Sequence, residues 1–326
     1  MRVPASFADE LGRVMAASDL LMTGFGPAGD ETAAGALAHY MTQPGRASGL
    51  PVLCIGAGRA CEAASERLRP VAVAVDLLYF ACVHHDDVAD DGGTRHGKAT
   101  INRAWSPGVG VWSGDVLFFR VFAEIHEHLP EGLRKTLGSL AIAAAADMQQ
   151  FVHAGDVVRS EEIYFRAVGQ KAGLLCGLAC WLGASAAAAP SDRVRDLEAY
   201  GAGFGTAFQI ADDARDYGAR RTGGDRKEAG QDFAAGIVTL PVILAWRRGT
   251  AEERAFWNRA LRQETREEGD FEQARELLAR YDAIGDSLRE ARRYGEGAKS
   301  NLAAFRNRAA DELAWLVDRY IADVEE

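Results

Sequence analysis

The sequence predicts an all-α fold, formed by a single bundle of helices. Residues that favour helices, chiefly Ala, Leu, Glu and Arg, dominate most of the 326-residue chain. Short breaker pairs, such as Gly26-Pro27, Gly92-Gly93 and Gly223-Gly224, separate the helix-compatible stretches. No repeat, low-complexity tract or linker divides residues 1–326, so we expect one domain.

The helix-compatible stretches follow one another along the whole chain. They are residues 7–22, 31–42, 57–85, 112–128, 131–154, 161–189, 192–217, 233–248, 251–264, 270–294 and 297–324. The run from Val71 to Val75 alternates like a β-strand, but it continues into apolar residues without a turn signal. We therefore expect it to form part of a buried helix.

The charge balance argues against nucleic acid as a partner. The chain has 37 Lys and Arg residues against 47 Asp and Glu residues, which gives a net charge of −10. Such a chain lacks the broad basic surface that would displace counterions from phosphates. Only five of the basic residues are Lys, so the position of each Lys is informative.

The cysteines and the apolar segments bear on location. The five cysteines are Cys54, Cys61, Cys82, Cys176 and Cys180. They have no CxxC or His-paired spacing, which favours buried free thiols over zinc or disulfides. Residues 1–14 lack the apolar core of a signal peptide, and the uncharged stretch 172–191 is rich in Gly and Ala. We expect that stretch to be a core helix, in a cytoplasmic protein without stable membrane insertion.

Two carboxylate clusters carry the chemistry that the sequence predicts. The first is Asp86-Asp87-Val88-Ala89-Asp90, and the second is Asp212-Asp213-Ala214-Arg215-Asp216. On a helix, residues i and i+4 lie one turn apart, so like charges would repel unless a cation offsets them. One such cluster could be an exposed helix end, but two copies that each follow an apolar stretch favour a metal site. Mg²⁺ suits these ligands, because it takes one or two carboxylates while substrate phosphates complete its coordination.

Several basic residues near the clusters could bind a diphosphate group of the substrate, held between the two metal-binding clusters. Arg95 follows the first cluster, Lys171 precedes the uncharged stretch, and Lys227 follows the second cluster. Each alone would be read as a surface charge, but together they form a set of cations suited to phosphate oxygens. Gln209 shares the helix face of Asp212.

The motifs resemble those of the trans-isoprenyl diphosphate synthases. HHDDVADDGGTRHGKAT at 84–100 is similar to the first Asp-rich region of that family, and FGTAFQIADDARD at 204–216 to the second. SGDVLF at 113–118 looks like the start of the SGD helix, and DFAAGIVTLPVILA at 232–245 is similar to the TLP element.

The resemblance implies an isoprenoid-synthase fold, a homodimer and an allylic prenyl diphosphate substrate held by three Mg²⁺ ions. It assigns Asp86, Asp87, Asp90, Asp212 and Asp216 to the metals, and Arg95, Lys171, Lys227 and Gln209 to the diphosphate. The catalytic set would be Asp86, Asp90, Asp212 and Lys171, because metals and cations stabilise the departing diphosphate.

The chain departs from this family where the second substrate, isopentenyl diphosphate (IPP), usually binds. Positions that normally carry Lys, Arg, His and Arg hold Ala47, Leu50, Tyr79 and His96. Desolvating a second diphosphate against such residues would cost several kcal/mol. The sequence therefore predicts that the cation passes to a non-IPP acceptor or undergoes intramolecular cyclisation. In relatives, the residues five and four positions before the first cluster line the end of the prenyl cavity. Here they are the small Ala81 and Cys82, so the resemblance implies a pocket for a chain of 15 to 20 carbons.

Two alternatives remain open from the sequence. The chain could be an ordinary chain-elongating geranylgeranyl or farnesyl diphosphate synthase that uses IPP. It could also be a non-catalytic subunit that modulates an active synthase, although such partners usually lose an Asp-rich motif and both are intact here.

Overall fold

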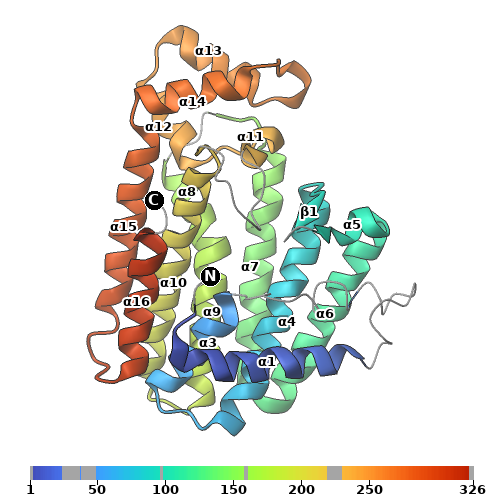
Figure 1. The fold of residues 1–326 in the computed structure, drawn as a ribbon, viewed down its shortest axis with the longest axis vertical. Coiled ribbons are helices and arrows are strands. Elements are labelled where there is room, and N and C mark those ends of the chain that lie inside the picture. Colours follow the sequence, from blue (N-terminus) through green and yellow to red (C-terminus); the bar gives the residue numbers. More distant parts are fainter. Residues whose placement is uncertain are drawn as a thin grey trace.

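Long helices lie side by side in an upright bundle, with shorter helices across its upper end (Figure 1). The computed structural model describes residues 3–23, 37, 49–95, 98–157, 161–218 and 230–322. The lower and central helices are α1 (Ala5–Thr23), α3 (Gly49–Ala60), α4 (Ser65–Ala89), α5 (Ile101–Ala104), α6 (Pro107–His128), α7 (Leu133–Val152), α8 (Glu161–Val168), α9 (Leu174–Ala186) and α10 (Ser191–Arg215). The all-α prediction is confirmed.

The remaining helices form the upper layer and one side of the bundle. They are α11 (Gln231–Ala235), α12 (Leu240–Arg248), α13 (Ala251–Ala260), α14 (Asp270–Arg280), α15 (Ala283–Ser300) and α16 (Arg308–Ala322). Short turns are η1 (Pro130–Gly132), the π-turn η2 (Gly169–Gly173) and η3 (Gln263–Thr265). One small antiparallel hairpin, β1 (Thr94–Arg95) with β2 (Lys98–Ala99), was not expected from the sequence.

Several expected helix boundaries are wrong. The stretch 57–85 contains two helices, because the chain turns between α3 and α4 with Glu62 at a φ of 59°. A second unexpected break follows α14, where Asp282 has a φ of 49°. α6 begins at Pro107 rather than at 112, since the Ser106 side chain caps it by accepting from the Val109 N–H. The SGD segment therefore lies inside α6. Of the stretch 31–42, only residue 37 is described.

Residues 71–81 of α4 are buried, apart from the half-buried Tyr79. Val71 to Val75 are helical and buried, as predicted, because this helix is apolar on all sides. The segments Ser65–Ala89 and Glu161–Ala186 are long and apolar enough to span a membrane. Inside the bundle, however, 72% and 56% of their apolar windows are buried, which is typical of core helices.

α10 packs unusually close to the helix formed by η2 and α9. A Cβ at Gly205 would lie 2.3 Å from the Ala172 carbonyl oxygen, and a Cβ at Gly201 would lie 2.4 Å from that of Cys176. From the other side, a Cβ at Gly173 would lie 2.8 Å from the Thr206 Oγ1. Only glycine allows the two backbones to approach this closely. We call this contact the glycine seam.

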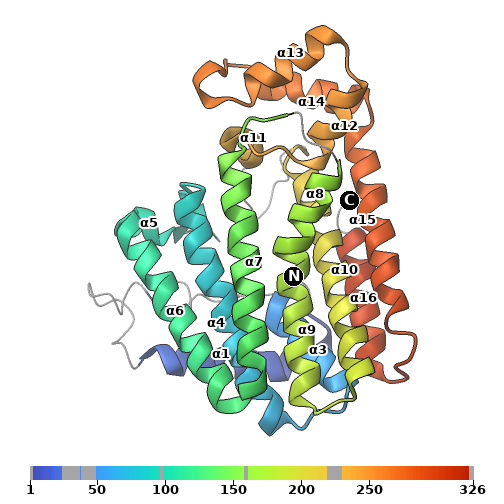
Figure 2. The ribbon, with the colours of Figure 1, turned by 180° about the vertical axis from the view of Figure 1, so that it is seen from behind.

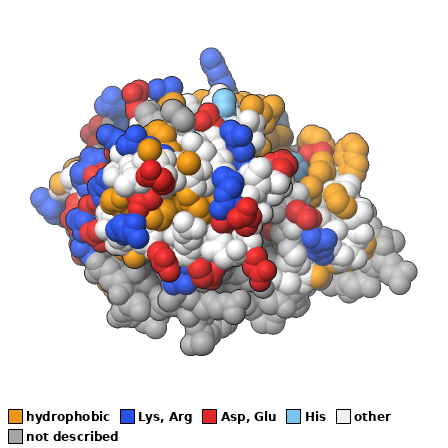
Figure 3. All heavy atoms as spheres, turned by 90° about the horizontal axis from the view of Figure 1, so that it is seen from above, with side chains coloured by type: hydrophobic (Ala, Val, Ile, Leu, Met, Phe, Trp, Pro, Cys, Tyr) orange, Lys and Arg blue, Asp and Glu red, His pale blue; other side chains and the backbone are white. Residues whose placement is uncertain are grey.

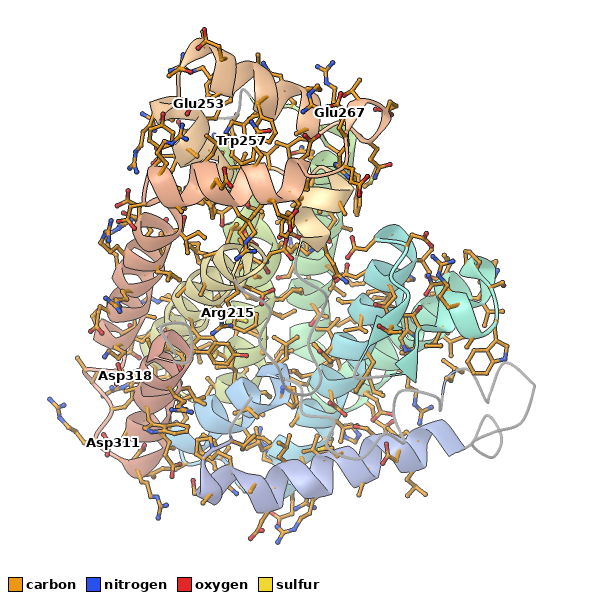
Figure 4. The ribbon with its side chains drawn as sticks, turned by 45° about the horizontal axis from the view of Figure 1, so that its top comes forward. Arg215, Glu253, Trp257, Glu267, Asp311 and Asp318 are labelled. Carbon is orange, nitrogen blue, oxygen red and sulfur yellow. The ribbon has the colours of Figure 1, made fainter. Side chains whose placement is uncertain are left out.

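The upper layer has its own apolar core, next to the carboxyl end of α10. Trp257 of α13 is fully buried, on the side of that helix that faces α14 (Figure 4). Asp270, at the start of α14, accepts hydrogen bonds from Arg259 at 2.9 and 2.6 Å. Burial alone would raise the pKa of Asp270, but Arg259 and the Glu267 N–H outweigh it and lower that pKa.

The glycine seam makes a prediction about stability. Replacing Gly205 by Ala should lower the free energy of unfolding by about 1–3 kcal/mol, because the added methyl group meets backbone atoms that cannot move aside. Gly12 is the matched control: it lies inside α1, and a Cβ there meets nothing within 4 Å. Gly12→Ala should be neutral or stabilising by up to about 1 kcal/mol. Thermal and denaturant unfolding measure both changes, and equal effects would contradict the seam.

Candidate active site

Both carboxylate clusters lie where long helices end. Asp86 and Asp87 are in the last turn of α4 and Asp90 caps its carboxyl end, while Asp212 is in the last turn of α10 and Asp216 caps it. α4 and α10 both end at the upper end of the bundle (Figures 1 and 2). The apolar stretch that precedes each cluster thus anchors it in the core.

The first cluster combines accessible and buried carboxylates. The Asp86 side chain is partly exposed and Asp90 is exposed, whereas Asp87 is buried. The chain turns back after the cluster, and the Gly92 N–H donates to the Asp87 carbonyl at 3.0 Å. Asp86 and Asp90 are therefore the members best placed to meet a soluble cation.

Lys171 faces the first cluster from the π-turn η2. Its Nζ lies 4.0 Å from an Asp86 oxygen and 2.7 Å from an oxygen of Asp147 on α7. Burial alone would lower the pKa of Lys171, but the carboxylates of Asp86 and Asp147 outweigh it and raise that pKa. Lys171 is thus a permanent cation at the first cluster.

Asp147 is a site residue that the sequence analysis missed. Burial raises the pKa of its carboxyl, and the charge of Lys171 opposes that rise. A single acid inside the Ala-rich helix segment AIAAAADMQQ was the available signal, because an unpaired carboxylate is costly on such a face.

α6 supports the first cluster through the SGD segment. A Cβ at Gly114 would lie 2.3 Å from the Cδ2 of His85, so glycine lets the His85 ring fit against α6. His85 Nε2 lies 3.2 Å from an Asp115 oxygen and 3.1 Å from the Val111 carbonyl. Because His85 directly precedes Asp86, this contact fixes the start of the cluster.

In the second cluster one carboxylate is exposed, and the other two accept hydrogen bonds from neighbouring groups. Asp212 is exposed, while Asp213 is only 6% exposed. Asp213 accepts from the Tyr164 hydroxyl at 2.6 Å and from the Gln209 amide at 2.7 Å. Burial raises the pKa of Asp213 to about 7; the two hydrogen bonds oppose this rise, and the charges of Asp212 and Asp216 add to it.

Asp216 connects the end of α10 to the start of α11. Its Oδ1 accepts from the N–H groups of Gly230 and Gln231 at 3.1 and 3.0 Å, and its Oδ2 accepts from the Asp232 N–H at 3.0 Å. A carboxylate at a helix amino end is favoured by the free N–H groups and the helix dipole. Asp216 therefore has a structural role in addition to any contact with a metal.

The other expected site residues are only partly described. Leu50 is buried at the start of α3, and Tyr79 is half-buried with its ring edge-on to Phe80. Ala81 is fully buried, and burial raises the pKa of the Cys82 thiol to about 12, with Asp86 and Asp147 adding to the rise. Ala47, His96, Lys227 and the side chain of Arg95 lie outside the described residues.

The donor set fits Mg²⁺ in company with a diphosphate. Within the described ranges, no three His, Cys, Asp or Glu side chains are grouped closely enough to hold a metal ion by themselves. Asp86 and Asp90 instead offer two accessible carboxylates at the first cluster, and Asp212 offers one at the second. That arrangement suits an ion that completes its octahedron with phosphate oxygens and water.

Comparison with known proteins assigns the family. A family model described as polyprenyl synthetase matches residues 31–278. The chain belongs to the polyprenyl synthetase family. A curated family member, component 2 of heptaprenyl diphosphate synthase from Geobacillus stearothermophilus, is 33% identical over 228 residues, which are 68% of this chain and 67% of that protein.

Solved structures of polyprenyl synthetases share the fold over nearly the whole chain. A decaprenyl diphosphate synthase from Rhodobacter capsulatus has a TM-score of 0.88 and 28% identity, covering 98% of this chain and 99% of that one. A polyprenyl synthase from Caulobacter crescentus, complexed with calcium and isoprenyl diphosphate, has a TM-score of 0.87 and 31% identity, covering 96% and 97%.

These relatives overturn one expectation from the sequence. Heptaprenyl and decaprenyl diphosphate synthases are named for building prenyl diphosphates, not for transfer to another acceptor or for cyclisation. The prediction of a non-IPP acceptor or of cyclisation is therefore wrong. It failed because the loss of cations at four sequence positions does not show that no other cation serves instead.

The Lys171–Asp147 pair makes a testable prediction. Asp147→Asn should leave Asp86 as the main partner of Lys171, so that Lys171 competes with a metal for that carboxylate. We expect turnover to fall by about 10- to 100-fold, as for other residues that orient ligands, with a higher Mg²⁺ requirement. The measurement is the rate as a function of Mg²⁺ concentration.

The chain offers a matched control for this variant. Lys135 and Glu198 form a similar ion pair at 2.5 Å, with similar exposure, away from both clusters. Glu198→Gln should leave the Mg²⁺ dependence unchanged. If the two variants behave alike, Asp147 has no special role at the site.

Proposed function

We propose that the chain is a chain-elongating prenyl diphosphate synthase. It would join an allylic prenyl diphosphate, of about 15 to 20 carbons at the start, to IPP and release diphosphate. The observation that carries this proposal is the position of Lys171. Its protonated amine pairs with Asp147 and lies 4.0 Å from an oxygen of Asp86. Asp212 is exposed at the same end of the bundle. The similarity to heptaprenyl and decaprenyl diphosphate synthases supports the same reaction class.

The metal would be Mg²⁺, in three ions as the family resemblance implies. We assign Asp86, Asp87 and Asp90 in the first cluster, and Asp212 and Asp216 in the second, to hold it. When bound, Mg²⁺ would act as a Lewis acid that offsets the negative charge of the diphosphate.

The residues of the chain would orient and stabilise the leaving diphosphate. Lys171 keeps its proton because two carboxylates raise its pKa, so it can contact phosphate oxygens as their charge grows. Arg95, Lys227 and Gln209 complete the proposed set. Ala81 and Cys82, on the wall of α4 before the first cluster, would leave room for the prenyl chain because both side chains are small.

A radiolabelled IPP assay tests the proposed reaction. Incubation with farnesyl or geranylgeranyl diphosphate and Mg²⁺ should yield longer labelled prenyl diphosphates, and EDTA should abolish the product. Asp86→Ala and Asp212→Ala should each reduce turnover by at least about 10³-fold, because each removes an accessible carboxylate from a cluster. Asp311→Ala, an exposed acid on α16, is the control and should retain activity.

The assay also decides between the remaining alternatives. Diphosphate release without label incorporation would contradict chain elongation. If purified protein with Mg²⁺ consumes no allylic diphosphate of ten, fifteen or twenty carbons, the modulatory-subunit alternative gains support. A curated relative is itself named as one component of a synthase.

We further propose that the protein is a cytoplasmic homodimer, joined through α6 and α7. Trp112 and Phe119 lie two turns apart on α6 and are 70% and 67% exposed, and Met148 and Val152 on α7 are also exposed. Hydrophobic side chains gather over α5 and α6 at the right of Figure 3. Exposed apolar patches of this kind mark interaction surfaces.

Disrupting this face should change the mass in solution. Phe119→Asp should convert a dimer of 35.1 kDa chains to a monomer, because a charge would be buried against apolar side chains. Light scattering coupled to size exclusion measures the mass. Trp315→Glu is the control, since Trp315 is an exposed aromatic on α16 and should not affect assembly. A wild-type monomer, or a Phe119→Asp dimer, would contradict the assignment.

A further inference from the structure

The second cluster depends on a carboxylate that no soluble cation can easily reach. Asp213 is nearly buried, and each of its two oxygens already accepts a hydrogen bond. The Gln209 amide that bonds Oδ1 comes from the preceding turn of the same helix, so this bond is local. The Tyr164 hydroxyl that bonds Oδ2 comes from α8 and is the contact that joins Asp213 to another element.

Tyr164 also belongs to the helix that carries Lys171. α8 continues through η2 into α9, and Tyr164 lies seven residues, or about two turns, before Lys171. The bond from Tyr164 to Asp213 therefore connects the element of Lys171 to the element of Asp212. The glycine seam holds the same two elements together about two to three turns further down.

The chemistry of the two donors matters for the neighbouring carboxylate. A hydroxyl and an amide satisfy Asp213 without adding a positive charge beside Asp212. An Arg or Lys in their place would compete with a metal for the cluster. Neutral donors leave the negative charge of the second cluster available to a divalent cation while fixing the last turn of α10.

We propose that Tyr164 is a positioning residue of the second cluster: by holding Asp213, it keeps the adjacent Asp212 oriented toward the metal. This inference rests on the proposed function, because it assigns Tyr164 a role toward a metal that this function requires. Loss of the hydroxyl would leave a buried acceptor unsatisfied, and the last turn of α10 would then move to find another partner.

Binding of Mn²⁺ tests the proposal without relying on turnover. Free Mn²⁺ is measured by electron paramagnetic resonance, with full-length protein in the presence of inorganic diphosphate. Tyr164→Phe should weaken Mn²⁺ binding by about 10-fold, in the range found for residues that orient metal ligands. In the activity assay, the Mg²⁺ concentration for half-maximal rate should rise by the same factor, while the KM for IPP stays unchanged.

Tyr200→Phe is a closely matched control. Tyr200 is also buried, and its hydroxyl donates to the Leu313 carbonyl at 2.7 Å, joining α10 to α16 at a distance from the cluster. Its loss should lower the thermal stability to a similar degree but leave Mn²⁺ binding unchanged. If both variants weaken binding equally, or Tyr164→Phe does not weaken it, the proposal is overturned.

Asp213→Asn distinguishes positioning from direct coordination, and it serves if Tyr164→Phe does not fold. An Asn can accept from Tyr164 through its oxygen and donate its amide to a flipped Gln209, so Mn²⁺ binding should stay within about 3-fold of wild type. Asp212→Asn should lose most of the binding. Equal losses in these two variants would make Asp213 a ligand and overturn the proposal.

The same measurement separates failure of the inference from failure of the proposed function. If wild-type protein binds no Mn²⁺ with diphosphate, the proposed function fails together with the inference. If wild-type protein binds Mn²⁺ and Tyr164→Phe binds it equally well, the inference alone fails.

Discussion

The geometry of the site depends on how closely α10 approaches the helix of η2 and α9. Gly173, Gly201 and Gly205 let these backbones meet where any side chain would collide. The same two elements carry Lys171 and Asp212, one on each side of the seam. A wider crossing would separate the protonated amine from the second cluster, and the hydroxyl of Tyr164 could no longer reach Asp213. Backbone packing in the core thus sets distances between charged groups at the end of the bundle.

The second constraint is electrostatic. Six carboxylates at two helix ends repel one another unless they are exposed, hydrogen-bonded or paired with cations. The protein uses all three solutions: Asp90 and Asp212 are exposed, Asp213 and Asp216 accept neutral N–H or O–H donors, and Asp86 lies near Lys171. Only the last solution involves a permanent charge. The clusters consequently remain net negative, which is the condition for attracting divalent cations that bring a diphosphate with them.

Much of this could be read from the sequence. The all-α fold follows from composition, and the helical state of Val71 to Val75 follows from the absence of a turn signal after them. Lys171 was expected near the diphosphate from the family resemblance, and the structure adds its approach to Asp86. Asp147 could not be assigned, because its role depends on α7 lying beside η2, a contact between segments with no shared motif. The break between α3 and α4 could not be predicted either. Glu62 adopts a left-handed conformation there, and the sequence has no Gly, Asn or Pro at the turn to indicate it. A tertiary contact decided the first case, and a turn closed by local hydrogen bonds decided the second.

The wrong acceptor prediction has a physical explanation in the same terms. Leu50 and Tyr79 indeed offer no positive charge, but a diphosphate responds to charges nearby in space rather than to particular sequence positions. Arg215 shares the helix face of Asp212, and its guanidinium stacks 5.7 Å from the centre of the Tyr320 ring. Burial raises the pKa of Tyr320 and the charge of Arg215 opposes that rise, so a guanidinium on α10 lies against a residue of α16 although no motif links the two segments. A substituted residue at one sequence position therefore does not exclude a substrate, because charges contributed by other helices also act on a bound diphosphate.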